Sequence, residues 1–168
     1  MLSSLVTSIL TDFAERTILG IRTNLETLNA TGHGPMDTTG KMKNSLGFRI
    51  DAEGLTIFSS EKYFTVVETG RKPTSPGASA GSPTVRENIE NWIVAKGITP
   101  DGITVKSLAY LISRKIHEEG SLLYRQGGKS GVISNEINDK RIKEGLTDQL
   151  TDKLREFIIN EFVRKAID

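Results

Sequence analysis

The chain of 168 residues contains no cysteine. This absence excludes disulfides, zinc sites with thiolate ligands, iron–sulfur clusters and a thiol nucleophile. The sequence also lacks a run of 18 apolar residues, so we expect no membrane-spanning helix. The first residues carry no basic stretch, and Asp12 and Glu15 interrupt the apolar positions that follow, a pattern unlike a secretory signal. We therefore expect a protein that stays where it is made.

An excess of charge of one sign is absent as well. Lys and Arg number 22, Asp and Glu number 21, and the net charge is +1. A free-standing nucleic-acid-binding domain usually carries a clear basic excess, so this balance disfavours DNA binding by the single chain. Hydrophobic residues make up 36% and charged residues 26%, which is typical of a globular domain rather than a disordered chain. The length predicts a single domain over residues 1–168.

Apolar residues recur at steps of three and four in several segments, which indicates amphipathic helices. The predicted helices cover residues 3–28, 84–96, 104–119 and 136–167. Residues 61–70 are predicted to form a short helix or a turn that ends at Gly70. Thr84 and Glu87 have the spacing of a capping box, and Thr104 is a candidate N-cap. Gly145 is expected to bend the last helix.

Two short segments instead alternate apolar and other residues. They are separated by the turn Ala52-Glu53-Gly54, and together they predict a β-hairpin over about 45–60. Val132 and Ile133 favour one further strand near 131–134. The predicted fold class is therefore α+β: a small antiparallel sheet packed against long N- and C-terminal helices and two central helices.

Three segments rich in glycine and polar residues are predicted to be flexible loops. They cover about 29–44, 71–82 and 121–135. The second contains Pro, Ser, Gly and Ala after Arg71 and Lys72 and has no residue that builds a core. Structureless loops of this length in a compact domain often carry function or become ordered on a partner.

No motif for catalysis, cofactor binding or metal binding stands out. His33 and His117 each lack the second histidine of a metal-binding motif. The run Gly127-Gly128-Lys129-Ser130 resembles the end of a phosphate-binding loop, but the earlier glycine of that motif is missing. We therefore expect no metal, no cofactor and no enzymatic activity.

Glu68 lies among apolar residues in the segment Phe64–Gly70. A small hydrolase that uses Glu68 with His117 would need the two side chains within hydrogen-bond reach or joined by one water. The alternative is a structural role, in which Glu68 pairs with Arg71 or caps backbone amides near Gly70. A lone carboxylate without a catalytic partner favours the structural role.

Basic residues gather modestly at two of the predicted loops. Arg71 and Lys72 begin one loop, and Arg125 and Lys129 flank glycines in another. On a single chain these residues belong to a solvated surface of mixed charge. In a closed ring of many copies, the same residues would form a belt of positive charge around a DNA channel.

The middle of the chain resembles a known family in the order and spacing of several short motifs. The segment Thr39–Leu46, TGKMKNSL, resembles the family pattern T-G-x-L-x-x-S-I. Tyr63 and the segment Val67–Pro73, VETGRKP, resemble the pattern Y-x-x-x-V-E-x-G-T-x-x-x-P. Residues 89–98 and the spacing of Ala109, Ile112, Ile116 and Gly120 resemble the two helices that follow. The family is that of the tailed-bacteriophage neck proteins, called tail-completion, head–tail joining or minor capsid proteins.

The resemblance covers about residues 39–120 and implies a structural, non-enzymatic virion protein. It implies a homo-oligomeric ring between the portal or connector and the tail proteins, with genomic DNA passing through the lumen and no membrane contact. A tail terminator or another tail-associated ring is the alternative, and a hydrolase or a nucleic-acid-binding module is less favoured. The implied location is the virion neck or tail, and the host cytoplasm before assembly. Arg71, Lys72, Pro73, Arg125 and Lys129 are the predicted contacts with neighbouring subunits or the lumen.

Overall fold

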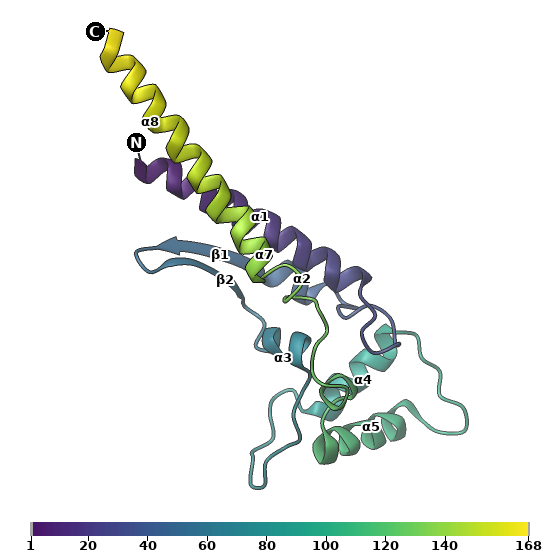
Figure 1. Cartoon of the computed structure of the whole chain (residues 1–168). Coiled ribbons are helices and arrows are strands. Elements are labelled where there is room, and N and C mark those ends of the chain that lie inside the picture. The colour runs from purple at the N-terminus through teal and green to yellow at the C-terminus, as the bar shows by residue number, and fades with distance from the viewer. Residues whose placement is uncertain (1, 168) are drawn as a thin grey trace.

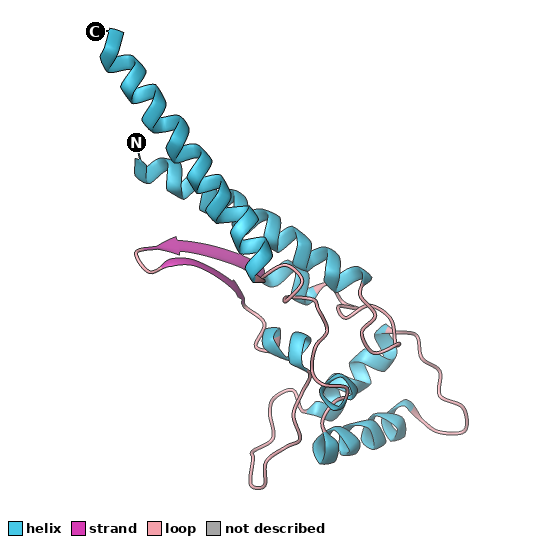
Figure 2. Cartoon of the chain, in the orientation of Figure 1, coloured by secondary structure: helices cyan, strands magenta, loops and turns pink. Residues whose placement is uncertain are grey.

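A computed structural model gives the fold; it describes the backbone of residues 2–167 and the side chains of residues 4–160. The long helices α1 and α8 run antiparallel, and both chain ends lie at the same end of the molecule (Figure 1). The hairpin and the shorter helices follow along α1 towards its far end (Figure 2). The elements are α1 (Leu2–Thr27), α2 (Lys41–Ser45), β1 (Leu46–Asp51), β2 (Gly54–Ser59), α3 (Phe64–Thr69), α4 (Val85–Ala95), α5 (Val105–Glu119), α6 (Leu122–Arg125), α7 (Asp139–Ile142), the π-helical turn η1 (Lys143–Thr147) and α8 (Asp148–Ile167). The predicted α+β class is confirmed.

The main core lies at the middle of the molecule, where the second half of α1 meets four other segments. Its buried residues are Ile18, Ile21, Leu25, Met42, Leu46, Val67 and Val132. The three α1 residues lie three and four positions apart, so they form one apolar stripe on the helix. Because that stripe contacts α2, β1, α3 and the loop before α7, a single helix face organises the fold.

The sheet is the predicted hairpin. β1 and β2 pair antiparallel, with Phe48 opposite Ile57 and Ile50 opposite Leu55. Directly opposite residues share a face of the sheet, and Phe48 and Ile57 pack against the core. On the other face, the Phe58 ring lies over Gly47, where a β-carbon would come within 3.0 Å of Phe58 Cζ.

The two central helices form where the caps predict them. Thr84 and Glu87 make the reciprocal hydrogen bonds of a capping box at the start of α4. Thr104 Oγ1 accepts a hydrogen bond of 3.1 Å from the backbone N–H of Ser107 at the start of α5. α4 packs on α5 in an antiparallel pair at the end of the molecule away from both termini (Figure 1).

Two predictions are corrected. The further strand near 131–134 does not form, and the described backbone there consists of turns. Its N–H groups at Gly131 and Ile133 donate to the Glu68 carboxylate rather than to a neighbouring strand. The segments 29–44 and 121–135 are also not loop throughout, because they contain part of α2 and all of α6. Ser121 caps α6 by accepting from the backbone N–H of Tyr124.

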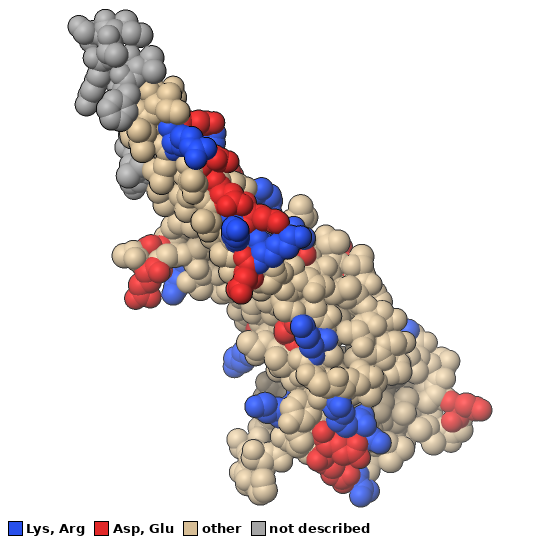
Figure 3. Space-filling model, in the orientation of Figure 1, with Lys and Arg blue, Asp and Glu red and all other residues tan. Residues whose placement is uncertain are grey.

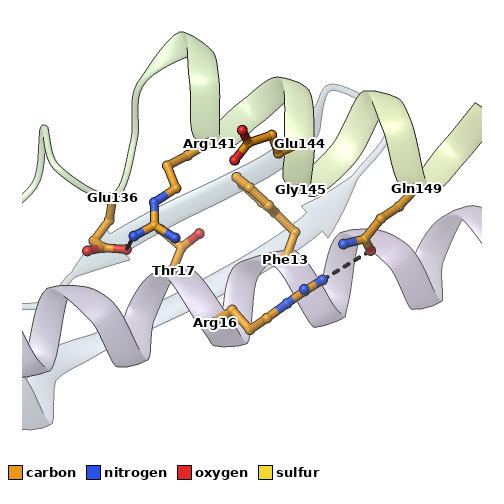
Figure 4. A pocket seen from close by; sticks show the side chains of 8 residues that line it. All are labelled: Phe13, Arg16, Thr17, Glu136, Arg141, Glu144, Gly145 and Gln149. Carbon is orange, nitrogen blue, oxygen red and sulfur yellow. Dashed lines mark hydrogen bonds and ion pairs between the residues drawn. The ribbon is translucent and has the colours of Figure 1, made fainter.

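The predicted C-terminal helix is divided into α7, η1 and α8. Gly145 lies in the π-helical turn, directly against the buried ring of Phe13 on α1 (Figure 4). A β-carbon at position 145 would lie 2.6 Å from Phe13 Cδ2. Glycine is therefore required here for close packing between the C-terminal segment and α1.

We expect Gly145→Ala to lower the free energy of unfolding by about 1–3 kcal/mol, since the added methyl overpacks against Phe13. Phe13→Ala removes that obstacle, so the cost of Gly145→Ala should fall in the Phe13→Ala background. Urea unfolding of the wild type, the two single variants and the double variant measures this coupling. Additive effects of the two substitutions would contradict the contact.

Candidate interaction surface

Two segments far apart in sequence meet at what we call the loop junction, residues 68–74 and 117–134. The backbone N–H of Ser121 donates to the carbonyl of Arg71 at 2.8 Å, and Ser121 Oγ accepts from the N–H of Arg71 at 2.9 Å. The N–H of Thr74 donates to the carbonyl of His117 at 2.9 Å. These bonds tie the start of the loop at 71–82 to the end of α5.

Two glycines permit this close approach of backbones. Gly70 has φ 73 and ψ 167, and a β-carbon there would lie 2.4 Å from the backbone nitrogen of Tyr124. Gly120 has φ 86, and its β-carbon would lie 2.8 Å from the carbonyl oxygen of Arg71. A residue with a β-carbon is disfavoured at both positions, because φ is positive and the neighbouring backbone is too close. The two glycines that end α3 and α5 therefore also form the junction.

Glu68 is the centre of the junction. Its Oε1 accepts hydrogen bonds from Ser134 Oγ at 2.7 Å and from the N–H of Gly131 at 3.2 Å. Its Oε2 accepts from the N–H of Ile133 at 2.8 Å and from Ser130 Oγ at 3.1 Å. One side chain on α3 thus holds the whole turn at 130–134, and the partners it caps lie 62 to 66 residues away.

These contacts set the protonation state of Glu68. Partial burial acts to raise its pKa, but the hydrogen bonds from Ile133, Ser134, Ser130 and Gly131 together lower the pKa below its ordinary value. Hydrogen bonds to the charged form have this effect because the donors stabilise the carboxylate. Glu68 is therefore ionised at neutral pH.

Glu68 and His117 have separate partners. Both carboxylate oxygens of Glu68 are engaged with residues 130–134. His117 Nδ1 lies 2.6 Å from Thr74 Oγ1, with which it shares a hydrogen bond. Within the described residues no hydrogen bond joins Glu68 to His117. The observed contacts are those of the structural role, with amide capping by Glu68 in place of a pair with Arg71.

The five residues predicted as contacts lie on the two sides of the loop junction. Arg71 is half-buried, and its Nη2 donates to Thr74 Oγ1 at 3.3 Å. Its Nη1 is buried and has no hydrogen-bond partner among the described residues. Lys72 and Pro73 are exposed, as are Arg125 and Lys129. The fold therefore brings the two basic stretches together.

The charges at the junction are partly neutralised. Arg125 forms an ion pair of 3.1 Å with Glu119, which also lies 3.7 Å from Lys115. Lys72 and Lys129 have no ion pair within the described part of the chain. Blue and red side chains are interspersed over the face shown in Figure 3. This face carries no continuous basic stripe of the kind that binds a duplex on its own.

A cavity of about 230 Å³ lies between α1 and the C-terminal segment (Figure 4). Arg141 Nη2 on its wall lies 3.7 Å from Glu136 Oε2, and Arg16 Nη2 donates to Gln149 Oε1 at 3.0 Å. Arg141 therefore has its ion-pair partner within its own segment, whereas Arg16 is hydrogen-bonded across the cavity to a neutral amide. The contact between Arg16 and Gln149 joins α1 to the C-terminal segment.

Sequence reasoning missed the serines that complete the junction. Ser121, Ser130 and Ser134 are the side-chain partners of the Arg71 backbone and the Glu68 carboxylate. Ser121 had a local signal, since a serine directly after the helix-ending Gly120 is a typical N-cap. The other two had none, because their partner is remote in sequence.

Within the described residues, no group of three His, Asp or Glu side chains is arranged to hold a metal ion. No helix in the described part of the chain is long and apolar enough to cross a membrane. Comparisons with protein-family models, with curated proteins and with solved structures give no match.

Proposed function

We propose that this chain is a structural subunit of a tailed-bacteriophage neck, in which copies form a ring that joins the head and portal to the tail around the DNA channel. The observation that carries the proposal is the amount of surface that the single chain exposes. The motifs over residues 39–120 support the same assignment.

The accessible surface of the chain is 11245 Å². A compact monomer of 18.4 kDa is expected to expose only about 8,200 Å². The excess, about 3,000 Å², is the scale of surface that large permanent assemblies bury. Because the long helices and the hairpin extend from a small core, the chain has the shape of a part that packs against others (Figure 1).

Apolar side chains contribute to this exposed surface on several elements. Those at least 36% exposed include Leu19 on α1, Phe58 on β2, Val94 on α4, Tyr110 and Leu111 on α5, and Ile158 and Ile159 on α8. They are distributed around the molecule rather than gathered in one pocket. Such a distribution suits a subunit with neighbours on both sides and partners above and below.

The cations of the loop junction fit a channel through a ring. A subunit with a net charge of +1 does not repel its copies strongly. Lys72 and Lys129 lack ion pairs within the described residues, and repetition around a ring would multiply their charge. The proposal places this junction towards neighbouring subunits or the lumen, where non-specific attraction to phosphates needs no base contacts.

The test is to remove the protein from particles produced by the genome that encodes it. Without the chain we expect DNA-filled heads and separate tails, and supply of the wild-type chain should restore joined particles. Cryo-electron microscopy of the restored particles should show a symmetric ring of this chain at the junction of head and tail. Density at the tail side of the junction only would instead indicate a tail terminator.

Tail-bearing, infectious particles that assemble without the chain would overturn the proposal. So would its consistent absence from purified particles. A catalytic function would then be tested first by Glu68→Gln and His117→Ala in activity screens.

A further inference from the structure

The sheet of this protein consists of one hairpin that projects from the rest of the chain. β1 and β2 have six residues each and form the whole sheet within the described chain. A two-stranded hairpin is marginally stable on its own, and this one contacts α1 through both strands, with Phe48 and Ile57 packed against the core. The hairpin projects from the side of α1, and its tip is free of other segments in Figure 1.

The hydrogen-bond pattern between β1 and β2 shows which backbone N–H and C=O groups point to the outer edges of the sheet. The N–H of Ser60 donates to the carbonyl of Ser45, so this pair is hydrogen-bonded. Bonded and non-bonded pairs alternate along an antiparallel ladder. Leu55, Ile57 and Ser59 consequently direct their backbone N–H and C=O groups to the outer edge of β2. On β1 the outward groups are those of Leu46, Phe48 and Ile50.

The outer edge of β2 lacks the features that protect an edge strand. Its sequence, GLTIFS, has no charge and no proline, and its register with β1 contains no bulge. Isolated edges usually carry such features because an open edge binds other strands. Phe58 on the outer face of β2 is 44% exposed, which adds apolar surface beside the same edge.

We propose that the outer edge of β2 is the main subunit contact, and that its occupant is β1 of a second copy of this chain. The inference rests on the proposed function, since a repeated head-to-tail contact of this kind gives a ring when its rotation closes. Among the described residues no hydrogen bond from another segment engages the outward backbone groups of β1, so pairing β2 with the next β1 uses one edge of each strand. In a closed ring no edge remains open.

The chemistry of the two edges suits this pairing. Arg49 and Asp51 on β1 form an ion pair of 3.2 Å with each other, and β2 brings no charge against them.

A rotation that carries one hairpin to the next keeps β1 antiparallel to the preceding β2, so the sheet continues without a change of pattern. The excess surface of about 3,000 Å² is several times the ~800 Å² per partner of a standard interface. A second copy on each side can therefore be accommodated.

The first experiment removes one outward donor. Ile57→Pro deletes an N–H that points away from β1, so the bonds within the hairpin stay intact. Ile57→Ala is the matched control, because it loses the same core contact but keeps the N–H. Sedimentation equilibrium of the full chain should show an association constant about tenfold or more lower for Ile57→Pro than for Ile57→Ala. Circular dichroism of both variants verifies that they are folded.

The second experiment uses the absence of cysteine, which excludes background disulfides. Thr56→Cys and Arg49→Cys are prepared as separate chains, since the two positions face each other within one hairpin. Under mild oxidation, a mixture of the two variants should form a disulfide-linked heterodimer. Its yield should exceed the yield of linked homodimer that either variant forms alone. Asp51→Cys replaces Arg49→Cys to cover a register shifted by two residues.

The inference is overturned if Ile57→Pro and Ile57→Ala associate equally, or if Thr56→Cys cross-links mainly to itself, which would indicate pairing of β2 with β2. A wild-type chain that remains monomeric at every concentration and gives no cross-link overturns it as well. The neck role is decided separately in particles. A ring at the junction of head and tail whose hairpins are unpaired would retain the proposed function and reject this contact.

Discussion

Replacing Glu68 by alanine is expected to lower the free energy of unfolding by about 3 kcal/mol, which for a chain of this size corresponds to a fall in Tm of about 6–12 °C. The carboxylate accepts four hydrogen bonds, two of them from the backbone N–H groups of Gly131 and Ile133. Alanine leaves these donors without their partner next to the buried Val132. Urea unfolding followed by circular dichroism measures the loss.

Two further variants test the cause. Glu68→Gln keeps the shape but turns an amide donor towards N–H groups that also donate, so we expect an intermediate loss. Glu15→Ala removes an exposed carboxylate from α1 and should change the stability by no more than about 0.5 kcal/mol. If Glu68→Ala were as stable as Glu15→Ala, the turn at 130–134 would not depend on the carboxylate.

The contribution of Glu68 should also depend on pH. Its pKa is lower in the folded chain than the ordinary value of 4.5, so the unfolded chain binds the proton first as the pH falls. The stabilisation is therefore complete above the ordinary pKa and is lost as the pH decreases through the folded pKa. The difference in stability between wild type and Glu68→Gln should be constant near neutral pH and shrink below about pH 4.

Gly70→Ala is expected to have the second large effect, a loss of roughly 4 kcal/mol. The φ of 73 and ψ of 167 at this position belong to a region that only glycine occupies readily. The new methyl would in addition lie 2.4 Å from the backbone nitrogen of Tyr124, which cannot rotate away as a side chain could. Thermal unfolding should show a lower Tm, and limited proteolysis should show faster cleavage in the 71–82 loop, because the two segments of the junction separate.

Gly77→Ala is the control that distinguishes the cost of a positive φ from the cost of the steric clash with Tyr124. Gly77 also has a positive φ, 77, but a β-carbon at this position would have no atom within 4 Å. The substitution should therefore cost only about 1–2 kcal/mol, the usual penalty for a side chain in the left-handed conformation. Equal losses for the two variants would mean that the contact with Tyr124 is not what requires glycine at position 70.

Local signals account for most of the secondary structure. The capping box of Thr84 and Glu87 and the cap at Thr104 satisfy donors within three residues, so their pattern is visible in the sequence. The hairpin is likewise defined by alternation on both sides of a short turn. The strand predicted at 131–134 failed because a remote carboxylate, Glu68, competes for the same backbone N–H groups.

The predicted contact residues illustrate the same division. Their basic character and their position in loops are visible in the sequence, but the meeting of Arg71 with the segment that carries Arg125 depends on hydrogen bonds to Ser121, 50 residues away. The π-helical turn at Gly145 similarly lies against Phe13, far away along the chain. No periodicity or motif in the sequence predicts either contact.

Composition and local pattern are sufficient to predict the long helices, the caps of α4 and α5, the hairpin, the balanced charge and the lack of thiol chemistry. Each of these follows from composition or from residues within a few positions of one another. Three other properties become visible only once the chain has packed: the amide capping by Glu68, the meeting of the two basic segments at one junction, and the open outer edge of β2. These properties depend on which distant groups share a hydrogen bond or a surface, and that is settled when the chain packs around the apolar stripe of α1.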